Sequence, residues 1–132
     1  MRHKILLIDD TPIMLRLLSN ALRSDYDVIV AKDGKQGIAN AQKHKPDLIL
    51  LDLVMPEMSG FEVLQILKIE PETQKIPVML ITGNDSVDDE EKGYGLGALD
   101  YIRKPFVASI VRFKVRFVLD YSMMKQKLSE LE

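Results

Sequence analysis

The sequence predicts an α/β fold, a single doubly wound sheet of five parallel strands followed by an extended C-terminal helix. Two observations carry this prediction. Five short apolar runs alternate along the chain with segments whose apolar residues recur at helical spacing. The runs are also apolar almost throughout, which is typical of strands buried on both faces. Strand and helix in regular alternation require crossover connections, and these place helices on both faces of a parallel sheet.

The predicted strands are short, rich in Ile, Leu and Val, and bounded by charged or turn-forming residues. The third of them, Leu48-Ile49-Leu50-Leu51, has no polar residue and is expected at the centre of the sheet. In chain order the predicted strands span residues 5–8, 28–31, 48–51, 78–81 and 101–102.

The helices are predicted from caps, proline positions and apolar stripes. Thr11 is the expected N-cap of the first helix, with Pro12 at its first position. The second helix is expected over residues 35–43, before Pro46, and the third around Phe61 to Leu67, before Pro71. A fourth begins near residue 86, and the glycines at 93, 95 and 97 should fray its end.

The segment 107–132 carries two competing patterns. Apolar residues alternate with basic ones over residues 111–117, as in a strand. Against this, a heptad pattern with Lys114 as its exception runs through Val107, Ile110, Phe117, Tyr121, Met124, Leu128 and Leu131. Strong helix formers from Met123 onward favour the second pattern, so we predict one long helix.

Composition limits the classes of function. At 132 residues the chain is expected to form one domain, and its 46% hydrophobic and 29% charged residues are ordinary for a globular protein. A net charge of −2 favours neither nucleic acid nor an anionic membrane as a partner. The absence of cysteine excludes disulfides, thiolate metal sites and a cysteine nucleophile. With no secretory signal or long uncharged apolar span, we expect a cytoplasmic protein.

Acidic residues close two of the predicted strands. Asp52 follows the third strand and precedes Val54 and a Met-Pro turn, while Asp9 and Asp10 follow the first strand. The carboxyl ends of parallel strands share one edge of the sheet, where open α/β sheets bind ligands. Three carboxylates in one place repel each other unless a cation holds them together. The sequence therefore predicts metal-dependent chemistry on a phosphate.

Asp9-Asp10, Asp52, Thr82 and Lys104-Pro105 carry a family resemblance in their order and spacing. From Lys4 to about Leu119 the chain resembles the receiver domain of bacterial two-component response regulators. The resemblance implies a flavodoxin-like strand order, 2-1-3-4-5. We expect a receiver domain over residues 1–119, with residues 120–132 extending the last helix. That extension is predicted to be a coiled-coil stalk toward an output domain outside this chain, or a dimerisation helix, with a solvated tail as the alternative.

The resemblance also implies a chemical role for each acid. Asp52 resembles the phosphoacceptor, whose carboxylate attacks phosphorus and forms an acyl phosphate. Asp10 and Asp52 would bind Mg²⁺ directly, Asp9 through water, and the backbone carbonyl of Val54 would supply another ligand. Mn²⁺ could substitute for Mg²⁺.

Further residues are implied to bind the phosphoryl group and report on it. Lys104 and Thr82 would each contact a phosphoryl oxygen. Tyr101 matches the aromatic switch residue whose ring turns inward on activation, and the bond before Pro105 is expected to be cis. Val54 and Asn84 occupy positions that tune the phosphate lifetime in the family, and the lifetime here stays open.

The implied function is a signalling switch in a phosphorelay. A histidine kinase or phosphotransfer protein would be the phosphoryl donor, and the domain would catalyse its own phosphotransfer and slow dephosphorylation without being an enzyme otherwise. We expect a homodimer through the fourth helix, the fifth strand and the final helix, where Arg103, Arg112, Lys114 and Arg116 lie near an acidic helix. No direct contact with nucleic acid or membrane is expected.

Two alternatives stay open at this point. A phosphatase of the haloacid-dehalogenase type also uses an aspartyl phosphate, magnesium, a threonine and a lysine. Those enzymes carry Asp-x-Asp after the first strand, whereas Asp9 and Asp10 are adjacent here, and their cap insertions are missing. The other alternative is a pseudo-receiver that never takes phosphate, against which the retained acids, Thr82 and Lys104 argue.

Overall fold

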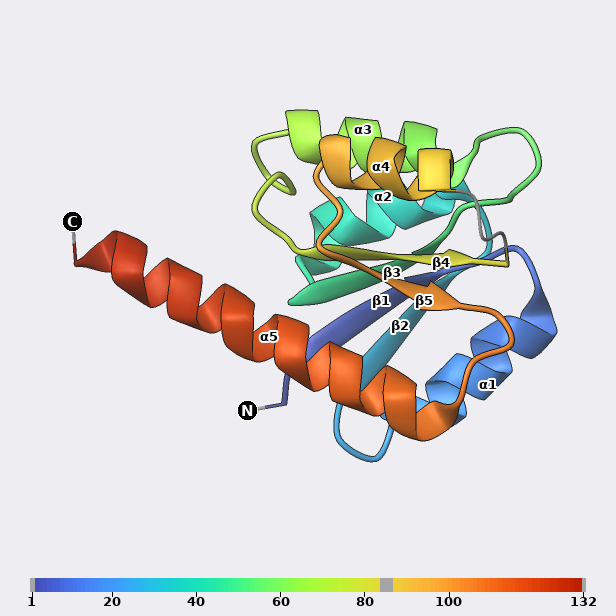
Figure 1. Ribbon diagram of the computed structural model, residues 1–132, viewed down its shortest axis with the longest axis horizontal. Helices are drawn as coiled ribbons and strands as arrows, with labels where there is room; N and C mark the ends of the chain where they lie inside the picture. Colours follow the sequence, from blue (N-terminus) through green and yellow to red (C-terminus); the bar gives the residue numbers. More distant parts are fainter. Residues whose placement is uncertain (1, 84–86, 132) are drawn as a thin grey trace.

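The computed structural model describes residues 2–83 and 87–131 and has strands and helices in strict alternation (Figure 1). Each predicted strand lies within an observed one, and the predicted helices are present. The elements are β1 (Lys4–Ile8), α1 (Pro12–Leu22), β2 (Asp27–Ala31), α2 (Gly34–His44), β3 (Leu48–Asp52), α3 (Gly60–Ile69), β4 (Val78–Thr82), α4 (Val87–Gly95), β5 (Asp100–Arg103) and α5 (Ala108–Glu130).

The five strands form one parallel sheet in the order β2-β1-β3-β4-β5. This confirms the predicted fold class and strand order. The register places Ile8 beside Leu51 and Asp52 beside Ile81, so the last residues of β1, β3 and β4 lie at one edge of the sheet. Figure 1 shows α1 and α5 on one face and α2, α3 and α4 on the other.

Each face of the sheet has its own hydrophobic core, because successive strand side chains point to opposite faces. Leu7 and Leu50 pack toward α1 and α5, together with Val111 and Val115. Their strand neighbours pack toward α2 and α3, in a second cluster that includes Leu6, Ile49, Leu51, Val63 and Leu64. The central strands are therefore fixed from both sides, and so are the residues at their carboxyl ends.

The start of α1 differs from the prediction in one detail. Pro12 is the first helical residue and Thr11 is the N-cap, but the Thr11 side chain makes no capping hydrogen bond. Instead, the backbone N–H of Thr11 donates to Oδ1 of Asp9 at 2.8 Å. The carboxylate of the preceding strand end thus organises this turn.

Helix α4 ends among the glycines at 93, 95 and 97, where the sequence predicts its end. The helix continues through Gly93 and ends at Gly95, while Gly97 lies beyond it with a φ of 109°. Only Gly97 of these three adopts the left-handed conformation that favours glycine. The predicted start of α4 near residue 86 lies at the edge of the described residues, and Asn84 lies outside them.

The final segment is one helix of 23 residues, as predicted, with Val107 at the N-cap position. Its buried residues are Val111, Val115, Val118 and Leu119. Lys114, the exception in the heptad pattern, donates from Nζ to the carbonyl oxygen of Tyr101 at 2.6 Å and lies 3.6 Å from the Asp100 carboxylate. The contacts of Lys114 with β5, the edge strand of the sheet, explain why a polar residue interrupts the heptad pattern at this position.

Across the described ranges 2–83 and 87–131, the helices are too short or too polar for a transmembrane span.

Candidate functional site

Three carboxylates meet at the carboxyl edge of the sheet. Asp9 and Asp10 follow β1, Asp52 ends the neighbouring β3, and one carboxylate oxygen from each lies within 4.8 Å of the others. Asp9 and Asp52 are buried, at 0% and 2% exposure, whereas Asp10 is exposed. The cluster therefore has a closed side formed by the sheet and an open side toward solvent.

Asp9 shows most directly that the cluster suits a cation. Its Oδ1 accepts the hydrogen bond from Thr11, while its Oδ2 is buried without a hydrogen-bond partner among the described residues. A buried carboxylate oxygen without a partner is costly. A hard divalent cation that prefers oxygen ligands fits this oxygen and its two neighbouring carboxylates.

The pKa of Asp52 is raised from 3.8 to about 6. Burial is the largest cause, followed by the negative charge of Asp9, and together they outweigh the nearby positive charge of Lys104. Lys104 Nζ lies 3.3 Å from Asp52 Oδ1. A cation bound between the acids would oppose both causes and favour the ionised carboxylate.

The loop after Asp52 returns to the site at Gly60, a residue to which the sequence assigned no role. A β-carbon at Gly60 would overlap the carbonyl oxygen of Asp52 and lie 2.7 Å from Cα of Leu53. The Gly60 N–H donates to the Leu53 carbonyl at 2.9 Å. The available signal was the position of this glycine directly after Ser59, whose hydroxyl caps α3.

Val54 lies at the rim of the site. Its side chain is 76% exposed, and its N–H is 3.4 Å from Oδ1 of Asp52, a long and weak contact. An apolar side chain here leaves the approach to Asp52 without a polar group from this position.

Thr82 and Lys104 come from the ends of adjacent strands. The N–H of Lys104 donates to the Thr82 carbonyl at 2.8 Å, and the Lys104–Pro105 peptide bond is cis. Thr82 is 2% exposed at the end of β4, the strand beside Asp52. The structure thus gathers the three acids and Lys104, with Thr82 on the neighbouring strand.

Tyr101 faces the helical layer rather than the acids. The residue is 3% exposed, and its hydroxyl lies 2.8 Å and 2.9 Å from the carbonyl oxygens of Asp89 and Glu90 in α4, to which it donates. Its ring meets that of Tyr94 edge to face, with centroids 5.0 Å apart. Burial raises the pKa of the Tyr101 phenol, so it stays a proton donor at neutral pH.

Gly93 leaves the space that the Tyr101 hydroxyl fills. A β-carbon at this position would overlap that hydroxyl and lie 2.6 Å from Cδ1 of Leu80. The sequence pattern pointed only to a frayed helix end, and the contact with Tyr101 was not predicted. This contact depends on Tyr101 of β5, which only the fold brings next to α4.

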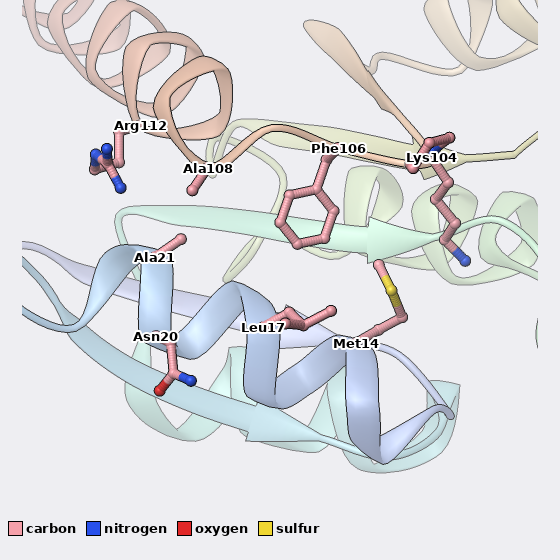
Figure 2. Close-up of a pocket in the computed structure, with 9 residues that line it drawn as sticks. Met14, Leu17, Asn20, Ala21, Lys104, Phe106, Ala108 and Arg112 are labelled. Carbon is pink, nitrogen blue, oxygen red and sulfur yellow. The ribbon is translucent and has the colours of Figure 1, made fainter.

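A groove opens beside Lys104, between α1 and the connection from β5 to α5 (Figure 2). Its volume is about 460 Å³, and Met14, Leu17 and Phe106 supply apolar walls. Arg112 lies at the far end of the groove from Lys104. The expectation that Arg112 belongs with the basic residues near α4 is therefore wrong, because its position on α5 turns it toward α1.

The chain has relatives among known proteins and solved structures. The family model for the response regulator receiver domain matches residues 5–116. The chain is 38% identical to the alkaline phosphatase synthesis transcriptional regulatory protein PhoP of Bacillus subtilis over 133 residues, covering 100% of this chain and 55% of PhoP. It is 38% identical to a probable cyclic di-GMP phosphodiesterase of Vibrio cholerae over 124 residues, covering 94% of this chain and 28% of that protein.

The fold has close counterparts among solved structures. The chemotaxis protein CheY4 of Vibrio cholerae superposes with a TM-score of 0.86 at 28% identity, covering 89% of this chain and 99% of CheY4. The chain spans about half or less of the length of the two sequence relatives, 55% and 28%. The match to the family model, the relatives and the strand order agree. The chain belongs to the receiver domain family of two-component response regulators, which act in signal transduction.

Proposed function

We propose that this chain is a phosphorylation switch in which Asp52 accepts a phosphoryl group from a histidine kinase or a phosphotransfer protein. One observation carries the proposal: buried Asp52 lies within 4.8 Å of two further acids and 3.3 Å from the ammonium group of Lys104. The candidate nucleophile, the candidate cation ligands and a fixed positive charge therefore lie within a few ångströms of one another. Membership of the receiver family supports the same conclusion.

The proposed transfer is an in-line displacement at phosphorus. An ionised Asp52 oxygen forms the new P–O bond while the bond from phosphorus to the donor breaks, and the donor leaves with that electron pair. Lys104 is placed to stabilise the charge on a phosphoryl oxygen, and the Thr82 hydroxyl would donate to another. Hydrolysis of the acyl phosphate by water would return the domain to its starting state, a slow self-catalysed step.

The proposed metal is Mg²⁺, with Mn²⁺ as a substitute. Asp10 and Asp52 would bind it directly, Asp9 through water, and the Val54 carbonyl would complete the protein ligands. The unpartnered Oδ2 of Asp9 supports this assignment. When bound, such an ion neutralises charge on the acids and the phosphoryl oxygens.

The proposed output is a change in association. Thr82 would move toward the phosphoryl group, and the packing of Tyr101 against α4 would respond, because its hydroxyl binds two α4 carbonyl groups. We propose that this favours a homodimer through α4, β5 and α5. Arg103 already pairs with Glu90 and Lys114 lies near Asp100 within one chain, so a dimer would have to share or exchange these ion pairs.

The groove beside Lys104 is the proposed docking surface for the phosphoryl donor. It is apolar, it opens next to the ammonium group that contacts Asp52, and it lies between two helices. A helical partner seated there could present a phosphohistidine to Asp52. We place this reaction in the cytoplasm, in line with the family, and propose no direct contact with nucleic acid or membrane for this domain.

The test is incubation with acetyl phosphate and Mg²⁺, followed by intact-mass measurement. We expect the chain to gain one phosphoryl group, and the Asp52→Asn variant to gain none. The exposed Asp25→Asn variant is the control and should be modified like the parent. Absence of modification would support a structural pseudo-receiver, and rapid turnover of many phosphomonoesters would support a phosphatase. Either result would overturn the proposal.

Association is tested separately by sedimentation with and without beryllofluoride, a mimic of the phosphoryl group. A shift toward dimer with the mimic is expected. An unchanged monomer in both states would remove the proposed output while leaving the phosphoacceptor assignment intact.

A further inference from the structure

Helix α5 has two separate apolar faces. One face packs on the sheet through Val111, Val115, Val118 and Leu119, all of which are buried. The other face is exposed. We call it the α5 stripe and define it as Phe117, Tyr121, Met124, Leu128 and Leu131, whose exposures are 64%, 46%, 65%, 59% and 80%.

The α5 stripe has the spacing of a coiled-coil seam. Its members follow one another at intervals of four, three, four and three residues. Alternating intervals of this kind keep one narrow line of side chains on one side of a helix, as at the a and d positions of a heptad. Exposed apolar residues without an interaction role are scattered singly, and a continuous line of five is different.

The part of α5 that bears the stripe has little support from its own domain. Beyond Leu119, Ser122, Met123 and Gln126 line a small cavity together with residues such as His3 and Pro77, and these three belong to another side of the helix. Figure 1 shows the end of α5 continuing past the sheet. The part of α5 after Leu119, residues 120–130, is a short helical segment. An isolated helix of that length is marginal in water, so a partner along the stripe would stabilise it.

We propose that the α5 stripe is the seam of a parallel, in-register coiled coil between two copies of this chain. The charges beside the stripe favour this occupant. With Phe117 and Met124 at d positions, Asp120 is at a g position and Lys125 at the e position of the next heptad. In a parallel pair these two positions face each other across the seam, so Asp120 of each copy meets Lys125 of the other.

Asp120 and Lys125 are available for that contact. Within its own chain, Asp120 Oδ2 lies 3.9 Å from Nε of Arg116, and both side chains are largely exposed, at 78% for Arg116 and 69% for Asp120. Exposed ion pairs of this length contribute little. Lys125 is also exposed, so its ammonium group is accessible to a carboxylate of a second copy.

The geometry of the domain permits this pairing. Successive helical residues are rotated by about 100°, so the stripe is centred more than a quarter turn from the face that packs on the sheet. The two sheets would therefore lie on the outer sides of the helix pair. This inference adds a contact along the distal part of α5 to the proposed dimer through α4, β5 and α5. It rests on that part of the proposed function, but the coiled coil itself does not require phosphorylation.

The chain has no cysteine, which makes disulfide crosslinking a direct test. Met123 and Met124 are neighbours of the same residue type, and only Met124 belongs to the stripe, so Met124→Cys and Met123→Cys are a matched pair. In unphosphorylated protein we expect Met124→Cys to form an interchain disulfide roughly tenfold faster or more, because the seam raises its effective concentration. Equal rates for the two variants would overturn the proposal.

The direction of the helices is tested with Phe117→Cys and Leu128→Cys. A parallel pair gives each variant a disulfide with itself and no preference for the mixed product. A mixture that yields mainly the Phe117–Leu128 disulfide would mean antiparallel helices and would overturn the parallel arrangement. Every sample is checked by circular dichroism so that an unfolded variant is not scored.

The charge pair gives a second readout. We expect Asp120→Lys alone and Lys125→Asp alone to weaken the dimer in sedimentation, and the double variant to restore it. Failure of the double variant to recover would contradict the proposed register. All these substitutions lie outside the acid cluster, so acetyl phosphate should still modify Asp52. A monomer that is still phosphorylated would therefore refute the coiled coil while leaving the phosphoacceptor assignment standing.

Discussion

The carboxyl edge of the sheet and the distal half of α5 are opposite exceptions to ordinary burial. At the sheet edge, Asp9 and Asp52 are charged groups placed in the interior. Along the α5 stripe, apolar residues such as Met124 and Leu128 are exposed to solvent. Each region is locally unfavourable, and each would be stabilised by something from outside the chain, a cation in the first case and a second helix in the second.

The contrast shows that a stable fold can keep locally unfavourable binding residues when well-packed residues beside them hold the backbone in place. The sheet edge tolerates buried acids because two hydrophobic cores hold β1 and β3 in place on both faces. The distal helix tolerates exposed apolar residues because its proximal half is anchored by Val111 and Val115. In both regions the stabilising contacts lie next to the functional ones rather than among them.

Gly60→Ala is expected to have the largest effect on stability, because it would disrupt the backbone at the carboxyl edge of the sheet. The new β-carbon would overlap the Asp52 backbone, which cannot move without displacing β3. We expect a loss of about 3 kcal/mol or more in the free energy of unfolding, measured by urea denaturation. Gly95→Ala is the control, because nothing lies within 4 Å of its β-carbon, and it should be neutral or stabilise by up to about 1 kcal/mol. Similar results for the two variants would contradict the described loop.

The next effect concerns the charge on Asp52. Its pKa is about 6 in the fold and 3.8 as the ordinary value, so the fold is relatively favoured while the carboxyl is protonated. That contribution is complete below pH 3.8 and is lost as the pH rises through about 6. Without divalent cations, Asp52→Asn should therefore stabilise the protein at pH 8 by up to about 3 kcal/mol, with the gain disappearing toward pH 4.

Chemical denaturation across this pH range measures the effect, with the exposed Asp25→Asn variant as the control. Added Mg²⁺ should stabilise the parent more than Asp52→Asn, because the variant lacks one carboxylate of the cluster. A parent protein whose stability is flat between pH 4 and pH 8 would contradict the burial argument.

A smaller effect is expected at Gly93. Gly93→Ala should displace Tyr101 from α4 and cost about 1–2 kcal/mol, since the gain in helix propensity offsets part of the lost packing. Tyrosine NMR signals report the exposure of the ring. In a background with Tyr101→Ala, the same change should destabilise less, because only the overlap with Leu80 remains. An additive double-mutant cycle would count against the contact with Tyr101.

The smallest effect compares the two faces of α5. Val115→Ala removes two buried methyl groups and should cost about 1–2 kcal/mol. Phe117→Ala, on the stripe, should change the stability of the monomer by less than about 0.5 kcal/mol when measured at low protein concentration. The same variant should weaken association, so a large loss of monomer stability would mean that the stripe packs on its own domain.

Much of the fold could be predicted from the sequence because its signals are local. Buried parallel strands are continuous apolar runs, and the prolines at 12, 46 and 71 limit the helices. Some element ends shifted by one residue, as in α2, which spans Gly34–His44 where residues 35–43 were expected. At Thr11 the helix start is as predicted, but the Thr11 side chain makes no capping hydrogen bond and its N–H donates to the Asp9 carboxylate instead.

Only those residues of the candidate site that lie at the ends of strands could be predicted to come together. Asp9, Asp10 and Asp52 could be placed together because the edge of a parallel sheet is a consequence of topology. The contacts of Gly60, Gly93 and Lys114 could not be predicted, because each residue meets a segment that only the fold brings near. Contacts of that kind have no periodic signature in the sequence.

Lys114 has a mechanical consequence. Its Nζ fastens α5 to the carbonyl of Tyr101, and the helix continues for a further 16 residues to Glu130. At 1.5 Å per residue this arm is about 24 Å long, so a tilt of about 5° at the fastening point would displace the far end by about 2 Å. A shift of β5 that is too small to disturb its own hydrogen bonds would therefore produce a larger displacement at the C-terminal end of α5.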